Sequence, residues 1–145
     1  MSLTRCLRIA AILCVMSEHS CSSNRGLSTS TLAPTSLSVC QIRSKHSLYD
    51  ESVVALTATI ISDGQHLILA IDPLCDDVAV AIEFSAGVAD APGVITINRA
   101  IFAGTPGTAG KHITGRFIGK LHVRDRRRPL LEVTAVDNVQ VSLAE

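Results

Sequence analysis

The segment from Ile113 to Val123 constrains the fold most, because apolar or glycine residues alternate in it with mostly polar ones. A period of two is typical of a β-strand that buries one face. The residues that share this face are Ile113, Gly115, Phe117, Gly119, Leu121 and Val123. Glycine inside a strand marks a sharp bend or the close approach of another backbone. We therefore expect a long strand that bends as strands do in a small barrel.

Other segments carry the patterns of shorter elements. Strand patterns cover 53–61, 66–71, 78–84 and 131–141, and the Asp63-Gly64 pair indicates a hairpin between the first two. Helical patterns cover 38–45, with Ser36 or Ser38 as N-cap, and 94–103. Within each of the first three strands one face is shared by Val54, Leu56, Ala58 and Ile60; by Leu67, Leu69 and Ile71; and by Val78, Val80, Ile82 and Phe84.

The order of these elements is three strands, a helix and two strands, which is the order of the OB-fold, a five-stranded and partly open barrel. We therefore expect a mainly β domain, a small five-stranded OB-like barrel (β-β-β-α-β-β) with a short N-terminal helix. An unrelated small β-sandwich is the alternative. Hydrophobic residues make up 47% of the chain and aromatic residues 3%, so the expected core is aliphatic.

The first 36 residues have the composition of an export leader followed by a linker. Arg5 and Arg8 flank the apolar block 9–16, which is too short to span a membrane, so residues 1–20 are expected to be a signal peptide. A buried helix is the alternative for this block. Residues 21–36 are rich in Ser and Thr and are expected to form a disordered linker, which leaves 37–145 as the barrel domain. The expected location is outside the cytoplasm, in the periplasm or cell envelope.

Two cysteines and a third one nearer the N-terminus are candidates for covalent modification. Cys40 and Cys75 lie inside the expected domain and should pair in an oxidising compartment. In the chain-entropy model the bridge would stabilise the fold by roughly 3 to 4 kcal/mol. Cys21 follows the leader and is a candidate lipidation site: Ser20 fits a lipoprotein signal, Glu18 does not, and ordinary cleavage nearby is the alternative.

Four short motifs resemble those of a loose set of uncharacterised, exported bacterial proteins with OB-like cores. The motifs are Val39-Cys40-Gln41-Ile42, Tyr49-Asp50 before the strand with Val54 to Ile60, Asp72-Pro73-Leu74-Cys75, and Thr114-Gly115-Arg116-Phe117. The chain departs from the pattern at Gln41, at 51–52 and at Ala58. The resemblance implies an architecture and a compartment, and no biochemical activity.

Three groups of residues invite a chemical interpretation, and each is better explained as structure. The segment 104–111 is glycine-rich and ends in a lysine, but His112 follows in place of Ser or Thr and a strand follows in place of a helix, so we expect a flexible connector and not a phosphate loop. The histidines at 46, 66, 112 and 122 lack a chelating spacing and are expected at the surface. The acids at 72, 76 and 77 lack the closing Glu of a calcium loop. We therefore assign no metal, no cofactor and no catalytic residue.

Basic residues are concentrated at one place. Arg116, Lys120, Arg124, Arg126, Arg127 and Arg128 surround the expected turn between the last two strands, where OB-folds often carry a ligand-contacting loop. They form a candidate anion-binding patch for phosphate, an anionic glycan or an acidic protein surface. A solvated hairpin tip is the alternative.

The sequence favours a non-enzymatic, exported OB-like binding or accessory module of the bacterial cell envelope. The formal net charge of zero provides no general attraction to nucleic acid. A domain that binds single-stranded nucleic acid is the first alternative, disfavoured because few aromatics are present for stacking. An enzyme whose site is assembled from scattered residues is the second. The ligand and the partner, an anionic molecule or an envelope protein, are not identified by the sequence.

Export yields a direct prediction. When the full-length gene is expressed in a bacterial host, N-terminal sequencing of the protein should show that roughly the first 20 residues have been removed. A cytosolic protein that keeps Met1 would contradict the prediction.

Overall fold

The structure is a computed structural model, and it describes residues 33–65, 67–75, 77–123 and 128–143. All elements named below belong to one structural unit, Leu32–Glu145. The expected signal peptide, Cys21 and most of the expected linker lie outside the described residues. So do His66, Asp76 and three members of the candidate patch, Arg124, Arg126 and Arg127.

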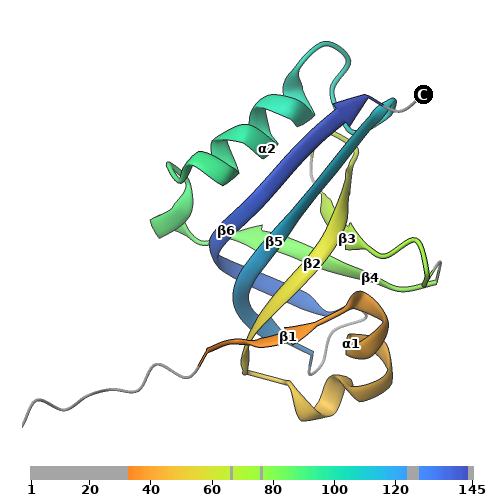
Figure 1. The fold of residues 1–145 in the computed structure, drawn as a ribbon, viewed down its shortest axis with the longest axis vertical. Coiled ribbons are helices and arrows are strands. Elements are labelled where there is room, and N and C mark those ends of the chain that lie inside the picture. The colour runs from red at the N-terminus through yellow and green to blue at the C-terminus, as the bar shows by residue number, and fades with distance from the viewer. Residues whose placement is uncertain (1–32, 66, 76, 124–127, 144–145) are drawn as a thin grey trace, which may run out of the picture. The chain divides into compact units, whose positions relative to one another are not determined.

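The described part of the chain is mainly β, which confirms the predicted class. It contains a six-stranded mixed sheet and two short α-helices (Figure 1). The elements are β1 (Thr35–Leu37), α1 (Val39–Lys45), β2 (Val53–Ser62), β3 (Ile68–Ile71), β4 (Ala79–Phe84), α2 (Pro92–Phe102), β5 (Lys111–His122) and β6 (Leu130–Leu143). Short 3-10 helices, η1 (His46–Leu48) and η2 (Ala86–Val88), follow α1 and β4.

The N-terminal strand β1 is the element that the sequence did not predict. It pairs in parallel with β2, with Thr35 opposite Val54 and Leu37 opposite Leu56. Thr35 and Ser36, assigned to the linker, therefore belong to the sheet. A strand this short, with Ser and Thr in it, has no alternation of its own and forms because β2 offers an edge. Directly after it, Ser38 caps α1: its Oγ accepts a hydrogen bond from the Gln41 backbone N–H, while Gln41 Oε1 accepts one from the Ser38 N–H.

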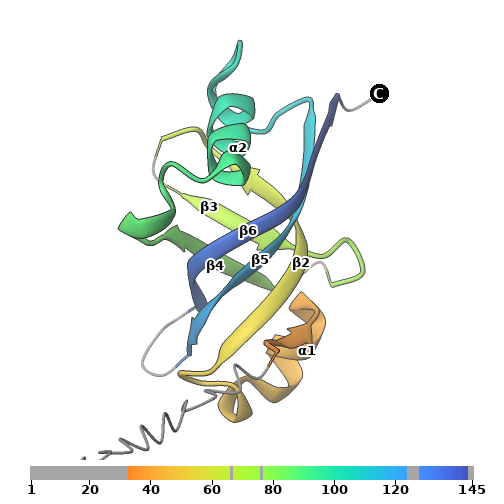
Figure 2. The same ribbon diagram turned by 60° about the vertical axis from the view of Figure 1, so that its left-hand side comes forward.

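The strand pairings form a cycle that begins and ends at β2. One edge of β2 pairs antiparallel with β3 and the other pairs antiparallel with β5. From β3 the pairing continues antiparallel to β4, parallel to β6 and antiparallel to β5. β5 and β6 run side by side and bend across the other strands, and α2 and α1 lie at opposite ends of the sheet (Figures 1 and 2).

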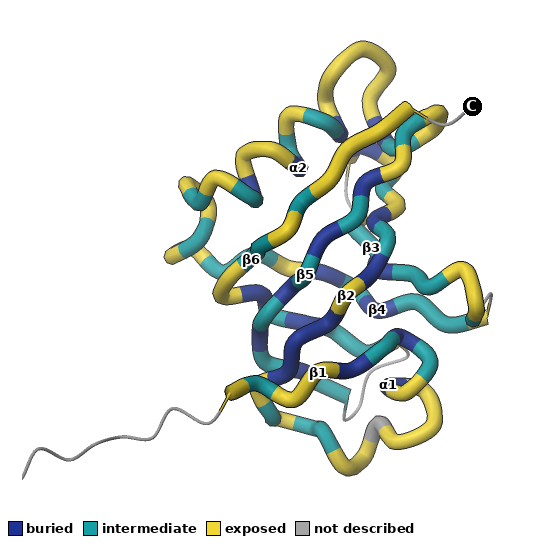
Figure 3. The backbone as a smooth tube through the Cα atoms, viewed as in Figure 1, coloured by how far each residue is buried: buried dark blue, intermediate teal, exposed yellow. Residues whose placement is uncertain are grey.

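The core is aliphatic around one fully buried phenylalanine, Phe117. The buried side chains of β2, β5 and β6 that surround it are Val54, Leu56, Ile60, Ile113, Leu121, Leu131 and Val133. Figure 3 shows this buried band along β2 and β5, whereas the outer side of α2 and the second half of β6 are exposed. From α2, Ile97 and Ile101 join the core, which fits the helical spacing predicted for this segment.

The facing of β3 differs from what its large aliphatic residues suggest. Leu69 and Ile71 do share a face, but that face points outward, because Ile60 pairs with Ala70 and Ile61 with Leu69. Ala70 is therefore fully buried, and Leu67, which precedes the strand, is exposed. Apolar residues lie on both faces of this strand, so its own sequence does not show which face is buried. The pairing with β2 decides it.

Gly119 lies where β5 passes closest to β6. A methyl group built on Gly119 would collide with the backbone carbonyl oxygen of Glu132 and lie 2.8 Å from the Val133 Cα. The register between β5 and β6 shifts at this point, between Ile118 and Gly119. The glycine therefore permits a close approach of two backbones, whereas the sequence had predicted only a bend in this strand.

We predict that Gly119→Ala destabilises the domain by about 3 kcal/mol or more, because the colliding atoms are backbone atoms that cannot rotate away. Equilibrium denaturation followed by far-ultraviolet circular dichroism measures the change. Gly87→Ala is the matched control, since a methyl group there meets no atom within 4 Å. Equal stabilities of the two variants would contradict the assigned role of Gly119.

Candidate functional site

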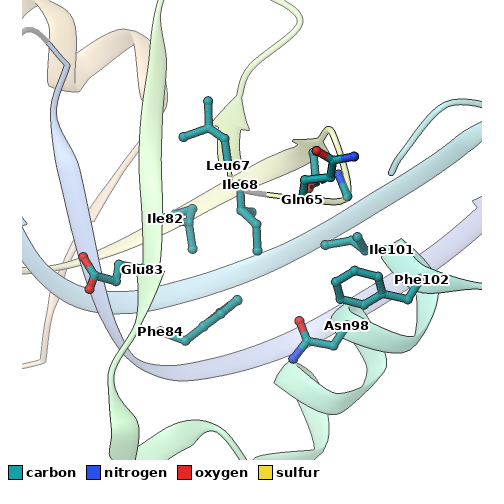
Figure 4. Close-up of a pocket in the computed structure, with 11 residues that line it drawn as sticks. Gln65, Leu67, Ile68, Ile82, Glu83, Phe84, Asn98, Ile101 and Phe102 are labelled. Carbon is teal, nitrogen blue, oxygen red and sulfur yellow. Dashed lines mark hydrogen bonds between the residues drawn. The ribbon is translucent and has the colours of Figure 1, made fainter. Parts of the chain in front are cut away.

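A groove opens between the β3–β4 hairpin and the C-terminal turns of α2, with a volume of about 320 Å³ (Figure 4). The turn after β2 closes one end of it. Its lining residues are Ser62, Gly64, Gln65, Leu67, Ile68, Ile82, Glu83, Phe84, Asn98, Ile101 and Phe102. The lining therefore combines six apolar side chains with four polar ones, those of Ser62, Gln65, Glu83 and Asn98.

The apolar side chains of the groove converge from two sides. Ile68, Ile82 and Phe84 point from the sheet toward α2, and Ile101 and Phe102 point back toward them (Figure 4). The alternation of β4 sends Ile82 and Phe84 inward and turns the Glu83 side chain away from the groove. Phe84 is only partly buried, and Phe102 has 59% of its surface exposed. Two phenyl rings thus remain available to a ligand.

Asn98 is the polar group that α2 contributes to the groove. It lies one helical turn before Phe102 on the same flank of α2, and its side chain points into the groove (Figure 4). Its amide offers two donors and one acceptor. Among the described residues, no hydrogen bond to this amide is found. Neither Asn98 nor Phe102 was singled out by the sequence; the available signal was that both lie off the helix face that carries Val94, Ile97 and Ile101.

The two turns beside the groove are fastened to each other. The Thr108 N–H donates to the Ser62 carbonyl at 3.0 Å, and the Ser62 N–H donates to Thr108 Oγ1 at 3.0 Å. Gly64 and Gly107 face each other with positive φ angles of 78° and 100°. A methyl group on Gly64 would lie 2.8 Å from the Pro106 backbone, so the turns can approach only as glycines.

Lys111 holds the segment after α2 in place. Its ammonium lies within 3.4 Å of four backbone carbonyl oxygens, those of Ile101, Ala103, Thr105 and Gly107. An ammonium with three donors is satisfied by these oxygens and offsets the negative end of the helix dipole. The expectation of a flexible connector is therefore corrected, because this lysine ties the loop to the helix. The surrounding groups are acceptors, whereas a phosphate loop presents N–H donors.

The candidate anion patch is distributed differently from the expectation. Arg116 and Lys120 share the outer face of β5, but Arg116 donates to Asp137 at 2.9 Å and Lys120 forms an ion pair with Glu51. The hydrogen bond from Lys120, followed by that from His122, lowers the pKa of Glu51, and the bond to Glu51 raises the pKa of Lys120. Arg128 is exposed. The structure therefore places two members of the patch against carboxylates.

His122 is more constrained than the expectation of a solvated histidine. Only 22% of its side chain is exposed, and its two ring nitrogens lie 2.7 Å from Glu51 Oε1 and 3.3 Å from Glu132 Oε2. Glu51 adopts a positive φ of 62°, and its N–H donates to the Leu121 carbonyl at 2.7 Å. His112 is exposed at the other end of β5. No group of His, Cys, Asp and Glu able to hold a metal is found within the described ranges.

Cys40 and Cys75 lie at disulfide distance, with Cα atoms 5.7 Å apart and a sequence separation of 35. The pair connects α1 to the segment between β3 and β4. Nearby, Asp72 Oδ1 accepts a hydrogen bond from the Leu74 N–H at 2.9 Å, and Asp77 pairs with Arg43. These two acids, considered as cation ligands from the sequence, therefore serve local turns and ion pairs.

Comparison with protein-family models, with curated proteins and with solved structures finds no match to this chain. No helix in the described residues is long and apolar enough to cross a membrane. The function must therefore be argued from the geometry of the groove and of the charged residues.

We predict that Lys111→Met lowers the free energy of unfolding by about 2 kcal/mol, because hydrogen bonds from a charged donor are worth roughly 1.5 to 3 kcal/mol. The amides of residues 104–110 should also exchange faster with solvent. Lys120→Met is the control on the same strand: it removes an exposed ion pair, which is worth about 0 to 1 kcal/mol. If Lys120→Met costs as much as Lys111→Met, the carbonyl contacts of Lys111 are not stabilising.

Proposed function

We propose that this chain is a non-enzymatic binding module of an exported bacterial protein, built on an OB-like barrel, and that its ligand occupies the groove between β4 and α2. The cyclic pairing order supports the barrel, because β2, β3, β4, β6 and β5 each pair with two neighbours. β1 then adds a short parallel strand to one edge. The helix between β4 and β5 stands where the OB order requires it.

Export to the periplasm or cell envelope is supported by the composition of the first 36 residues and by the pair of cysteines. The leader has a basic start and a short apolar block. Cysteines at disulfide distance within a small domain suit an oxidising compartment. A bridge between α1 and the β3–β4 segment would hold the two parts of the domain together without a larger core.

The groove is the observation that carries the binding role. Binding pockets are concave and mostly apolar, with a few polar groups that orient the ligand. This groove has that composition, and the exposed Phe102 at its rim has no structural need to be apolar. A fold does not by itself define a function, so the proposal rests on this site and not on the barrel.

Nucleic-acid binding is less well supported by the same surface. Such domains place stacking aromatics beside a basic groove. Phe84 and Phe102 could stack on bases, but no Lys or Arg occurs among the described residues that line the groove. Phe117 is fully buried and does not reach a ligand. The anion-binding role of the turn between β5 and β6 rests on Arg128 and on residues outside the described ranges.

The uncharged fluorescent probe N-phenyl-1-naphthylamine tests the proposal. It should bind saturably with one site per chain, and Phe102→Ser should weaken its binding about tenfold, since burying a phenyl side chain contributes roughly 1.5 to 3 kcal/mol. Leu74→Ser is the matched control, because Leu74 is 89% exposed and does not line the groove. Absence of saturable binding, or equal effects of the two variants, would refute the proposed site.

A further inference from the structure

We infer that the groove selects an uncharged amphiphile, an alkyl or aromatic group that ends in an amide or hydroxyl, and that Asn98 recognises the polar end. This inference rests on the proposed binding role of the groove and adds the chemical class of its ligand. Three features of the site lead to it: the size of the apolar surface, the unsatisfied amide, and the sign of the surrounding charge.

The size of the groove limits the apolar part of the ligand. Its volume of about 320 Å³ is near the lower end of the range for ligand pockets, which begins at about 300 Å³. A water molecule occupies about 30 Å³ in the liquid, so the groove accommodates roughly ten groups of that size. An unbranched chain of about eight carbons with a small polar end fills it.

The Asn98 amide requires a polar end on that ligand. In the unbound groove this amide is half-buried and can hydrogen-bond to water. A purely apolar ligand would remove the water and leave donors and an acceptor unpaired, and an unpaired buried polar group is costly. A primary amide can donate to and accept from Asn98 at the same time, and a hydroxyl can do either.

The charges around the groove exclude an anionic end. No Lys or Arg is among the described residues that line the groove, so an anionic end would lose its hydration without gaining a cationic partner. Lys111 does not compensate for an added anion, because its ammonium is directed at four backbone carbonyls. The one charged group among the described lining residues, Glu83, is an acid whose side chain points away from the groove, so it offers an anion no partner.

A cationic end is disfavoured by the apolar surface. An ammonium group in the groove would lose water without gaining a carboxylate, because the Glu83 side chain points away from the groove (Figure 4). The Asn98 carbonyl alone is a weak substitute for the lost hydration. An uncharged polar end thus hydrogen-bonds to the Asn98 amide and carries no charge that would lose its hydration.

The test is displacement of N-phenyl-1-naphthylamine at pH 7 by four ligands of equal chain length: octanamide, 1-octanol, octanoate and octylammonium. We expect octanamide to bind at least about tenfold more tightly than octanoate and octylammonium, with 1-octanol between them. Asn98→Leu should reduce this preference to less than about threefold while saturable binding of the probe, measured in the same variant, is retained. Asn98→Asp should shift the preference to octylammonium.

Glu83→Gln is the matched control for charge at the rim, and it should leave the order of the four ligands unchanged. The inference is overturned if octanoate or octylammonium binds best to the wild type, or if Asn98→Leu does not alter the order. If the probe binds saturably but the four ligands have equal affinities, the selectivity inferred here is wrong and the proposed binding role stands. Absence of probe binding would remove both.

Discussion

The close passage of β5 against β6 at Gly119 is the constraint on which the rest of the fold depends. At position 119 the two backbones lie too close together for a residue with a side chain. The register between β5 and β6 shifts by one residue at the same place. Before the shift, β6 pairs with both β5 and β4; after it, β6 continues along β5 alone. The bend therefore lets one strand serve two neighbours, and α2 packs beside β6 just after it, with Gly93 against Val136. The groove lies between the C-terminal turns of α2 and residues 82–84 of β4.

Period-two alternation made much of this predictable. The buried faces of β2, β4 and β5 follow from it, and the glycines of β5 indicated the bend. Two features were beyond its reach. β1 has no pattern of its own, and the residues of β3 alternate in both registers, so that only the partner strand determines that Ala70 is buried and Leu69 is not. In both cases the deciding interaction is with a partner strand, β2, and not within the segment itself.

The charged residues show the same limit more clearly. Arg116 and Lys120 stand out in the sequence as neighbours of an arginine-rich turn, which favoured a basic patch. Their partners Asp137 and Glu51 come from β6 and from the turn before β2, so the pairing is invisible until the strands are aligned. Such exposed pairs contribute little to stability. Their effect is to reduce the positive potential of this face. The groove is therefore a better candidate for the ligand site than the basic residues of β5.

Lys111 links the fold to the proposed selectivity. Its ammonium satisfies carbonyl oxygens at the end of α2 and along the following loop, and that loop is fastened in turn to the Ser62–Gly64 turn at the end of the groove. One set of contacts thus positions both the helix flank that carries Asn98 and the turn opposite to it. The same contacts engage a cation that would otherwise attract an anionic ligand. A site preorganised in this way loses less conformational entropy when a ligand binds, and it retains a preference for uncharged groups.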